Sequence, residues 1–267
     1  MTLDVLISTI DRGIHSAARV PIEPIDGVRW IVSWQMTSDE APELPPALRR
    51  PDVLVDTTRE RGLSRNRNNA LRLATADICL IADDDVTYTR EGLLTVIDAF
   101  ERHPSLQLAT FQFTTSEGNT PKAYPTVSFD LARPPRGYYV SSIETAFRRD
   151  AVQGRLAYCE LMGAGAPVLH AGEDELLVRH AVKAGLRCRY FPVVIVAHLG
   201  TSTGSRKPTE GVIMARGAMI GITRGRSRFP YCLAEAWRLH RFHDLPLLYS
   251  LTTLLRGARY ARRHGID

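Results

Sequence analysis

The chain has 267 residues, which suits one large α/β domain or one domain with a small appendage. Its apolar fraction of 44% and charged fraction of 24% are ordinary for a folded protein and exclude a disordered or collagen-like chain. A net charge of +5 favours anionic partners, but it does not choose among nucleic acid, nucleotide and membrane surface.

Short apolar runs alternate with helical patterns over the first 115 residues. Strands are expected at residues 3–10, 28–34, 53–56, 78–82 and 106–114. A helix is expected over residues 63–74, on a stripe formed by Leu63, Ala70, Leu71 and Ala74. A second helix should begin near Arg90 and end before Pro104. This alternation predicts a mostly parallel α/β sheet flanked by helices.

The second half of the chain is expected to contain more loops. Residues 116–136 are rich in Pro, Gly, Thr and Ser and should form loops, and residues 201–207 a further polar loop. Strands are expected at residues 138–148 and 189–197, and a helix over residues 173–184, stopped by Gly185. From Tyr231 onward the chain should be helical, with an interruption near Pro246.

The main chemical signal is a run of three carboxylates, Asp83, Asp84 and Asp85, directly after the apolar residues 78–82. In open α/β sheets, ligands bind at the carboxyl ends of strands. Clustered carboxylates repel one another, so a divalent cation that bridges a diphosphate would offset them. An acidic turn would produce the same run, and the apolar strand in front of it favours the ligand site.

A second acidic group, Glu173 to Glu175, begins the helix expected over residues 173–184. One of these residues could act as a general base and deprotonate an acceptor hydroxyl. Acids in the first turn also favour the helix dipole, so capping alone would explain them equally well. The small residues 163–166 just upstream would let a substrate approach the backbone closely.

Two further features are weaker when taken alone. His198 follows the strand expected at 189–197 and could complete a metal site begun by carboxylates, although a structural histidine is the commoner case. The run at residues 62–69 contains Arg65 and Arg67, which could bind a diphosphate or form a solvated helix face.

Taken in order, these segments resemble the family 2 glycosyltransferases of the GT-A fold, of the bacterial polysaccharide-biosynthesis type. The resemblance spans roughly residues 3–205. Its motifs are, in chain order, DVLISTI, GLSRNRNNAL, ICLIADDDV, GAGAPVLHAGEDELLVRHAVKAG and VAHLGTSTG. Each motif is weak or moderate by itself, and their ordered combination is specific.

The resemblance implies an inverting transfer of a sugar from a nucleotide-sugar donor, with UDP favoured, to a glycan or lipid-linked acceptor. It implies Asp174 as the catalytic base, with Glu173 as the alternative, and Asp85 and His198 as ligands of Mg²⁺ or Mn²⁺. It also implies a nucleotide-binding role for a set of five residues, Thr9, Asp11, Arg65, Asp83 and Asp84. The chain departs from the family in having Asp11 where many members have Asn.

The resemblance also sets the expected organisation. The fold class is α/β, a GT-A or Rossmann-like sheet with a helical C-terminal appendage. We expect a catalytic domain at 1–228, with a donor half at 1–115 and an acceptor half at 116–228, and a helical segment at 229–267. That segment mixes aromatic residues and leucine with arginine, so it either packs on the catalytic domain or lies at an anionic membrane surface.

The setting is expected to be cytoplasmic, or peripheral at the inner face of the membrane. The four cysteines are far apart and show no zinc-ligand spacing, which suits a reducing compartment. The N-terminus lacks the features of a signal peptide, and no apolar run reaches the roughly 18 residues of a membrane-spanning helix.

Two other function classes fit the sequence less well. A sugar-phosphate nucleotidyltransferase usually has a glycine- and arginine-rich phosphate loop after its first strand, and here that loop is only residues 11–13. A nucleic-acid-binding module is suggested by the basic charge, but the chain lacks a recognisable DNA- or RNA-reading motif. We therefore expect no nucleic-acid partner.

Overall fold

The computed structural model describes residues 1–38, 42–199 and 207–267. The chain divides into two compact units. Unit 1 comprises Met1–Arg61, Arg65–Tyr158 and Leu177–Ser202, and unit 2 comprises Gly62–Ser64, Cys159–Leu176 and Thr203–Asp267. The domain boundaries expected from the sequence, at residues 115 and 228, stay a prediction.

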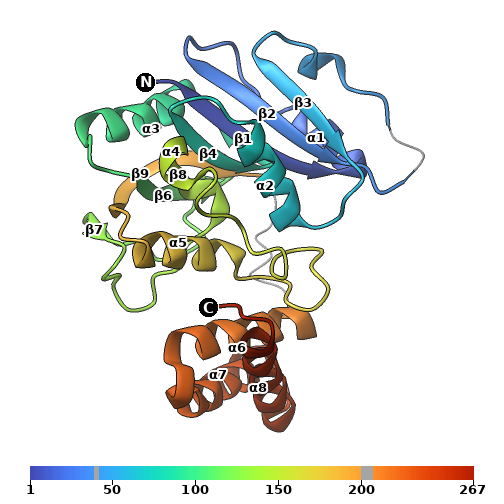
Figure 1. The fold of residues 1–267 in the computed structure, drawn as a ribbon, viewed down its shortest axis with the longest axis vertical. Helices are drawn as coiled ribbons and strands as arrows, with labels where there is room; N and C mark the ends of the chain where they lie inside the picture. The colour runs from blue at the N-terminus through green and yellow to red at the C-terminus, as the bar shows by residue number, and fades with distance from the viewer. Residues whose placement is uncertain (39–41, 200–206) are drawn as a thin grey trace. The chain divides into compact units, whose positions relative to one another are not determined.

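Unit 1 is built on one mixed sheet, whose strands are seen side by side in Figure 1. Its order among the described residues is β3-β2-β1-β4-β8-β6-β9-β5, with β7 beside β9. The neighbours β3, β2, β1 and β4 are parallel, as are β6 and β9, and the other pairings are antiparallel. The strand bounds are β1 Leu3–Ile10, β2 Val28–Gln35, β3 Val53–Thr58, β4 Ile78–Asp83, β5 Val86–Tyr88, β6 Leu108–Thr115, β7 Phe129–Asp130, β8 Thr145–Arg148 and β9 Cys188–His198.

Both faces of this sheet are buried, which explains why the central strands β1 and β4 are mostly apolar. Because side chains alternate across a strand, Val5 and Leu80 belong to one core, while Leu6 and Ile81 belong to the other. The first core also contains α3, and the second contains the buried stripe of α2. The helix bounds are α1 Ile14–Ala17, α2 Leu63–Leu73, α3 Arg90–Arg102, α4 Arg149–Val152 and α5 Glu173–Lys183.

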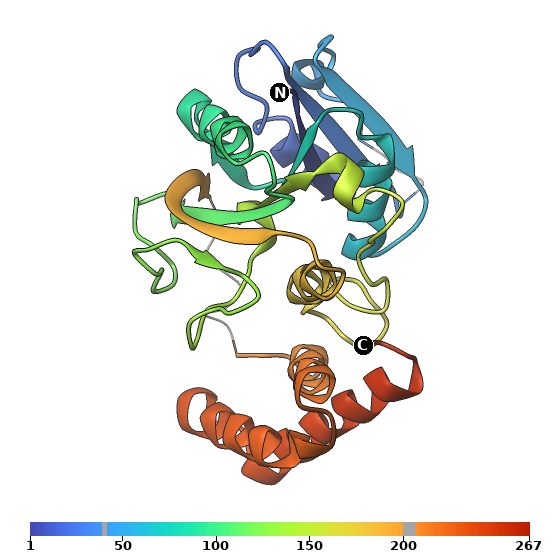
Figure 2. The same ribbon diagram turned by 60° about the vertical axis from the view of Figure 1, so that its left-hand side comes forward.

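Unit 2 contains a group of three helices, α6 Glu210–Arg224, α7 Arg228–His243 and α8 Leu247–Arg263, coloured orange to red in Figure 2. Thr209 caps α6 by accepting a hydrogen bond from the backbone N–H of Val212. Asp244 ends α7 in the left-handed conformation, at φ 51°. Pro246 is the N-cap residue of α8, a position at which its missing N–H costs no helical hydrogen bond.

Glycines allow α6 and α8 to cross with their backbones in contact. A Cβ atom on Gly217 would lie 2.0 Å from the carbonyl oxygen of Leu254. A Cβ atom on Gly257 would lie 1.9 Å from the carbonyl oxygen of Met214. No side chain fits at either distance, so these two positions set the helix spacing.

We predict that Gly257→Ala lowers the free energy of unfolding by about 1–3 kcal/mol, because the added methyl group forces the helices apart. In an isolated helix, replacing glycine by alanine would stabilise the helix by about 1 kcal/mol. A loss of stability in Gly257→Ala would therefore be caused by the close packing of α6 and α8. Thermal unfolding followed by circular dichroism measures the change, with Arg259→Ala, at an exposed position of α8, as the control. Unchanged or raised stability would contradict the close crossing.

Several expectations from the sequence need correction. The strand expected at 138–148 is confined to Thr145–Arg148, because Ser141 and Glu144 form a capping box around the 3-10 turn Ser142–Glu144. The C-terminal helices begin at Glu210, well before residue 231. Of the polar loop expected at 201–207, residues 201–206 lie outside the described residues. Among the described residues, no helix has the length and apolar character needed to cross a membrane.

Candidate functional site

The three carboxylates lie at the carboxyl end of the parallel strands. β1 and β4 are paired so that Ser8 is opposite Asp83, the last residue of β4. Asp84 and Asp85 follow in the turn before β5. The expectation that the run follows a buried strand is therefore confirmed, and the carboxylates occupy the sheet edge at which α/β folds bind ligands.

Asp84 is the most enclosed of the three. The hydroxyl of Thr9, at the end of β1, donates a hydrogen bond to its Oδ2 atom. Burial, together with the charges of Asp85 and Asp83, raises the pKa of Asp84 to about 6, although the Thr9 hydrogen bond opposes this. A carboxylate cluster under this strain would be stabilised by a nearby cation.

Gly13 lies close to both Asp84 and Thr9. A Cβ atom at this position would lie 2.5 Å from both Asp84 Oδ2 and Thr9 Oγ1. A side chain at position 13 would therefore have to displace the Asp84 carboxylate or the Thr9 hydroxyl, because the 3-10 turn Asp11–Gly13 comes this close to them.

We predict that Gly13→Ala displaces Asp84 and weakens nucleotide binding about tenfold, while lowering stability by about 1–3 kcal/mol. His15→Ala, at an exposed position in the next turn, is the control and should change neither quantity. Nucleotide titration and thermal unfolding measure the two effects. Wild-type affinity in Gly13→Ala would show that the position of Asp84 does not matter.

Asp83 is held by a buried arginine. Arg67 is 2% exposed and donates from Nη2 to Asp83 Oδ1 at 3.0 Å, and its guanidinium lies 5.3 Å from the Tyr158 ring centroid. The Ser142 hydroxyl lies 3.5 Å from Asp83 Oδ2. Arg67 thus neutralises one carboxylate of the run and fixes its direction.

Polar residues of α2 form hydrogen bonds to residues of β1, β2 and β3. Asn66 donates to the carbonyl oxygen of Thr9 at 2.9 Å. Asn69 donates to Asp56 Oδ2 at 2.7 Å and to Ser33 Oγ at 2.9 Å. The run at residues 62–69 therefore has a positioning role that the sequence analysis did not assign.

Asp85 pairs with His198. β5 and β9 are antiparallel with Val86 opposite His198, and this register places His198 Nε2 3.3 Å from Asp85 Oδ1. Burial raises the pKa of the Asp85 carboxyl, and the neighbouring His198 opposes the rise. The two residues expected as metal ligands are thus brought together.

Asp85 and His198 could supply two of the ligands that a divalent ion needs. Two ligands of an octahedral ion with bonds of about 2.1 Å lie about 3 Å apart, close to the spacing of the Asp85 and His198 atoms. Within the described ranges, no group of three or more His, Cys, Asp or Glu residues is arranged around a metal-sized space. The remaining ligands would therefore have to come from a bound phosphate and from water.

The second acidic group lies in unit 2. Glu173 is 6% exposed, and a Cβ atom on Gly163 would lie 3.0 Å from both its Cδ atom and Ser64 Oγ. Gly163 and Gly165 have φ angles of 102° and 80°, as expected for a small-residue loop. Asp174, the expected base, is the next residue of α5 and is half-buried. This loop therefore packs closely against the acidic start of α5 within unit 2.

Two residues assigned to the nucleotide lie elsewhere in unit 1. The Asp11 carboxylate accepts hydrogen bonds from the hydroxyl and backbone N–H of Thr37, which lower its pKa. Asp11 thus joins the end of β1 to the loop after β2. Arg65 is exposed, while Arg67, two residues further along α2, is buried and pairs with Asp83. A nucleotide-binding role for Asp11 and Arg65 stays a prediction.

Comparison with known families identifies the class of protein. The model of the family described as Glycosyl transferase family 2 matches residues 9–155, more than half of the chain. The chain therefore belongs to this family. The match covers Thr9, the carboxylate run and Arg67, the residues whose contacts are described above.

A curated relative is the Pre-mycofactocin glycosyltransferase of Mycobacterium tuberculosis, found in two strains. It is 28% identical over 141 residues, which are 52% of this chain and 30% of that protein. The chain thus matches less than a third of the length of this relative.

Solved structures confirm the expected GT-A fold with its helical C-terminal region. S. aureus TarS 1-349 superposes with a TM-score of 0.60 at 14% identity, covering 99% of this chain and 92% of that one. TarS was also solved in complex with UDP-GlcNAc. The mannosyltransferase PcManGT from Pyrobaculum calidifontis, in complex with GDP-Man and Mn²⁺, gives a TM-score of 0.52 at 17% identity, covering 98% and 75% of the two chains.

Proposed function

We propose that this chain is an inverting, metal-dependent glycosyltransferase that moves a sugar from a nucleotide-sugar donor to the hydroxyl group of a glycan or lipid-linked acceptor. The observation that carries the proposal is the carboxylate run at the edge of parallel strands β1 and β4, in a chain of glycosyl transferase family 2. A hexosyl donor and a place in polysaccharide biosynthesis are part of the same proposal.

The donor side of the reaction belongs to the carboxylate run. Asp85 and His198 would hold Mn²⁺ or Mg²⁺, and the imidazole nitrogen suits Mn²⁺ better, because Mg²⁺ prefers oxygen ligands. The chemistry supplied by such an ion is stabilisation of the negative charge on the departing diphosphate. Thr9 and Gly13 keep Asp84 in place, and Arg67 keeps Asp83 in place, so that the site is formed before the donor arrives.

The acceptor side is assigned to the start of α5. Asp174 would take the proton of the acceptor hydroxyl, whose oxygen then attacks the anomeric carbon as the bond to the diphosphate breaks. A single displacement of this kind inverts the anomeric centre. Glu173 is the alternative base, and the loop at residues 163–166 would border the acceptor.

UDP is the favoured nucleotide in this proposal. Among the structural neighbours, TarS was solved with UDP and with UDP-GlcNAc, whereas PcManGT was solved with GDP-Man. The acidic residue that many family members carry after the second strand is replaced here by residues 33–35, SWQ. The nucleobase therefore has to be established by direct measurement.

The competing functions receive less support. The match to glycosyl transferase family 2 weighs against a nucleotidyltransferase. A nucleic-acid-binding role would place the three carboxylates of residues 83–85 against the negative charge of the phosphate backbone. A cytoplasmic setting, where a nucleotide sugar would be available, remains part of the proposal.

A thermal-shift screen of nucleotide sugars with Mn²⁺ or Mg²⁺ tests the proposed function. A ligand that binds the folded state raises the melting temperature by mass action, so one family of nucleotide sugars should give a metal-dependent increase. The anomeric configuration of the product, read by proton NMR, then tests inversion. No increase with any nucleotide and any metal would overturn the proposal.

A further inference from the structure

Large apolar side chains are exposed in an unusual concentration on the hairpin of α7 and α8. Eight of the seventeen exposed large apolar residues of the described chain fall within residues 229–249. The most exposed are Leu248 at 74%, Phe242 at 70%, Trp237 at 58% and Phe229 at 53%. Exposed single apolar residues are ordinary, but a cluster of this kind marks a binding surface.

The residues follow the geometry of the helices. Phe229, Leu233 and Trp237 are spaced four apart on α7 and share one side of it, while Cys232, Ala236 and Leu239 form its buried side. Phe242, Leu247 and Leu248 surround the connection between α7 and α8, where the chain turns at Asp244 and Pro246. The exposed cluster therefore runs along α7 and over the tip of the hairpin.

The same hairpin is strongly basic. Residues 228–263 contain seven arginines and two acidic residues, Glu235 and Asp244. The net charge of this segment is therefore +5, the same as the net charge of the whole chain. Glu235 is paired with Arg216 and Arg238. Two copies of this surface would repel each other, whereas an anionic surface would be attracted.

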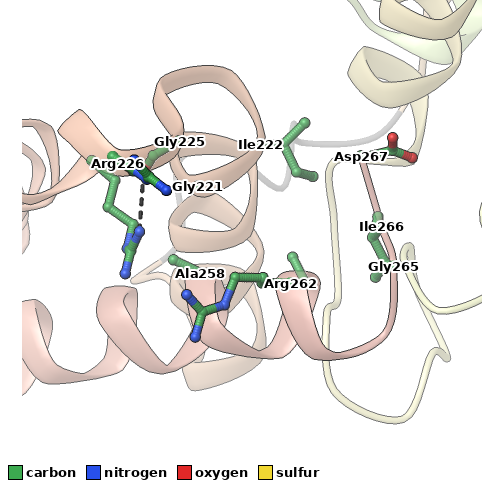
Figure 3. Close-up of a pocket in the computed structure, with 11 residues that line it drawn as sticks. Gly221, Ile222, Gly225, Arg226, Ala258, Arg262, Gly265, Ile266 and Asp267 are labelled. Atoms are coloured by element: carbon green, nitrogen blue, oxygen red, sulfur yellow. Dashed lines mark hydrogen bonds between the residues drawn. The ribbon is translucent and has the colours of Figure 1, made fainter.

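A cavity of about 580 Å³ lies between the end of α6, the turn that leads into α7, and the end of α8. Its wall contains three arginines, Arg226, Arg228 and Arg262, one acidic residue, Asp267, and the small residues Gly221 and Ala258. Figure 3 shows Gly221 of α6 facing Ala258 of α8 in this wall, with Arg226 and Arg262 at its border. The three guanidinium groups outnumber the Asp267 side-chain carboxylate, and they suit a phosphate group because guanidinium groups make charge-assisted hydrogen bonds to phosphate.

We propose that the α7–α8 hairpin docks on an anionic lipid bilayer, with its exposed aromatic and leucine side chains in the headgroup layer and the cavity arginines bound to lipid phosphate. Tryptophan and tyrosine concentrate at membrane–water interfaces, and here Trp237, Tyr231 and Tyr249 are all exposed. Basic charge beside an apolar face is the combination that holds a helix in the interface plane. This surface lies within unit 2 and needs no assumption about glycosyl transfer.

Tryptophan fluorescence of the full chain tests the proposal directly. The three tryptophans are Trp30 and Trp34, which are 1% and 4% exposed, and Trp237. Any change of emission on adding vesicles therefore reports Trp237. With vesicles of 30% phosphatidylglycerol in phosphatidylcholine, we expect a blue shift and quenching by a lipid labelled with a nitroxide near the headgroup, and little change with phosphatidylcholine alone.

Matched variants distinguish binding through the α7–α8 hairpin from nonspecific adsorption through any exposed apolar residue. Phe242→Ser/Leu248→Ser should bind the anionic vesicles about tenfold more weakly or worse, with an unchanged melting temperature, because both side chains are exposed. Val127→Ser, 68% exposed in unit 1, should bind like the wild type. Arg226→Gln/Arg262→Gln should reduce the preference for phosphatidylglycerol.

Three outcomes would overturn the proposal. One is wild-type vesicle binding by Phe242→Ser/Leu248→Ser. Another is binding that is equally tight to vesicles with and without phosphatidylglycerol, or no binding to either kind of vesicle. The third is a dimer in sedimentation velocity that this double variant converts to a monomer, which would make a second copy the partner of the surface.

Discussion

Asp174→Asn is expected to lower kcat by about 10²- to 10⁴-fold, the usual contribution of a general base. Asparagine has nearly the same shape as aspartate, but it cannot accept the proton of the acceptor hydroxyl. Because the change leaves the carboxylate run of unit 1 untouched, binding of the nucleotide with Mn²⁺ should stay within about twofold of wild type. Steady-state transfer kinetics and nucleotide titration measure the two quantities.

The first turn of α5 provides matched controls for this prediction. Glu175→Gln removes one negative charge from the same turn and should keep kcat within about fivefold, since a helix-dipole effect amounts to about 0.3–1 kcal/mol. Glu173→Gln decides between the two candidate bases. A large loss in Glu173→Gln, with kcat preserved in Asp174→Asn, would move the catalytic role to Glu173.

Asp85→Ala is expected to weaken Mn²⁺-dependent nucleotide binding about 100-fold or more, because it removes the carboxylate that faces His198. The loss should exceed that of His198→Ala, since Asp85 carries the charge that attracts the ion. Isothermal titration of UDP at fixed Mn²⁺ measures the affinity. When the metal is removed with EDTA, the wild type should bind UDP as weakly as Asp85→Ala does.

The control for Asp85→Ala is Asp98→Ala, which removes a carboxylate of α3 that is 50% exposed and forms an ion pair with Arg102. Its nucleotide affinity should equal that of the wild type, because exposed ion pairs contribute little. Equal affinity in Asp85→Ala and Asp98→Ala would show that Asp85 does not hold the ion.

The central strands could be predicted from the sequence because both of their faces are buried. β1 has the expected bounds, and β4 extends one residue beyond the expected 78–82, to Asp83. β5 has three residues, too few to show a period, and it was missed. α6 was also missed, since Gly211, Gly217 and Gly221 give it a poor helix propensity, and its close packing on α8 explains why it forms.

The site could be predicted where its chemistry lies in consecutive residues. The carboxylate run and His198 were identified, and the structure places Asp85 beside His198. Arg67 was missed as a contact of Asp83, although it lies four residues before Leu71 and seven before Ala74 on the buried stripe of α2. An arginine on a buried stripe needs an acidic partner, and this pattern would have identified it. The role of Gly13 depends on the distance to Asp84, which no local pattern encodes.

Titration of UDP into the full chain, with and without Mn²⁺, tests the central claim that the carboxylate run holds a metal–nucleotide complex. The structure predicts saturable binding with Mn²⁺, at least about 100-fold weaker binding without it, and the same loss in Asp85→Ala. Binding that is equally tight without metal, or no binding of UDP or any other nucleoside diphosphate with Mn²⁺ or Mg²⁺, would contradict it.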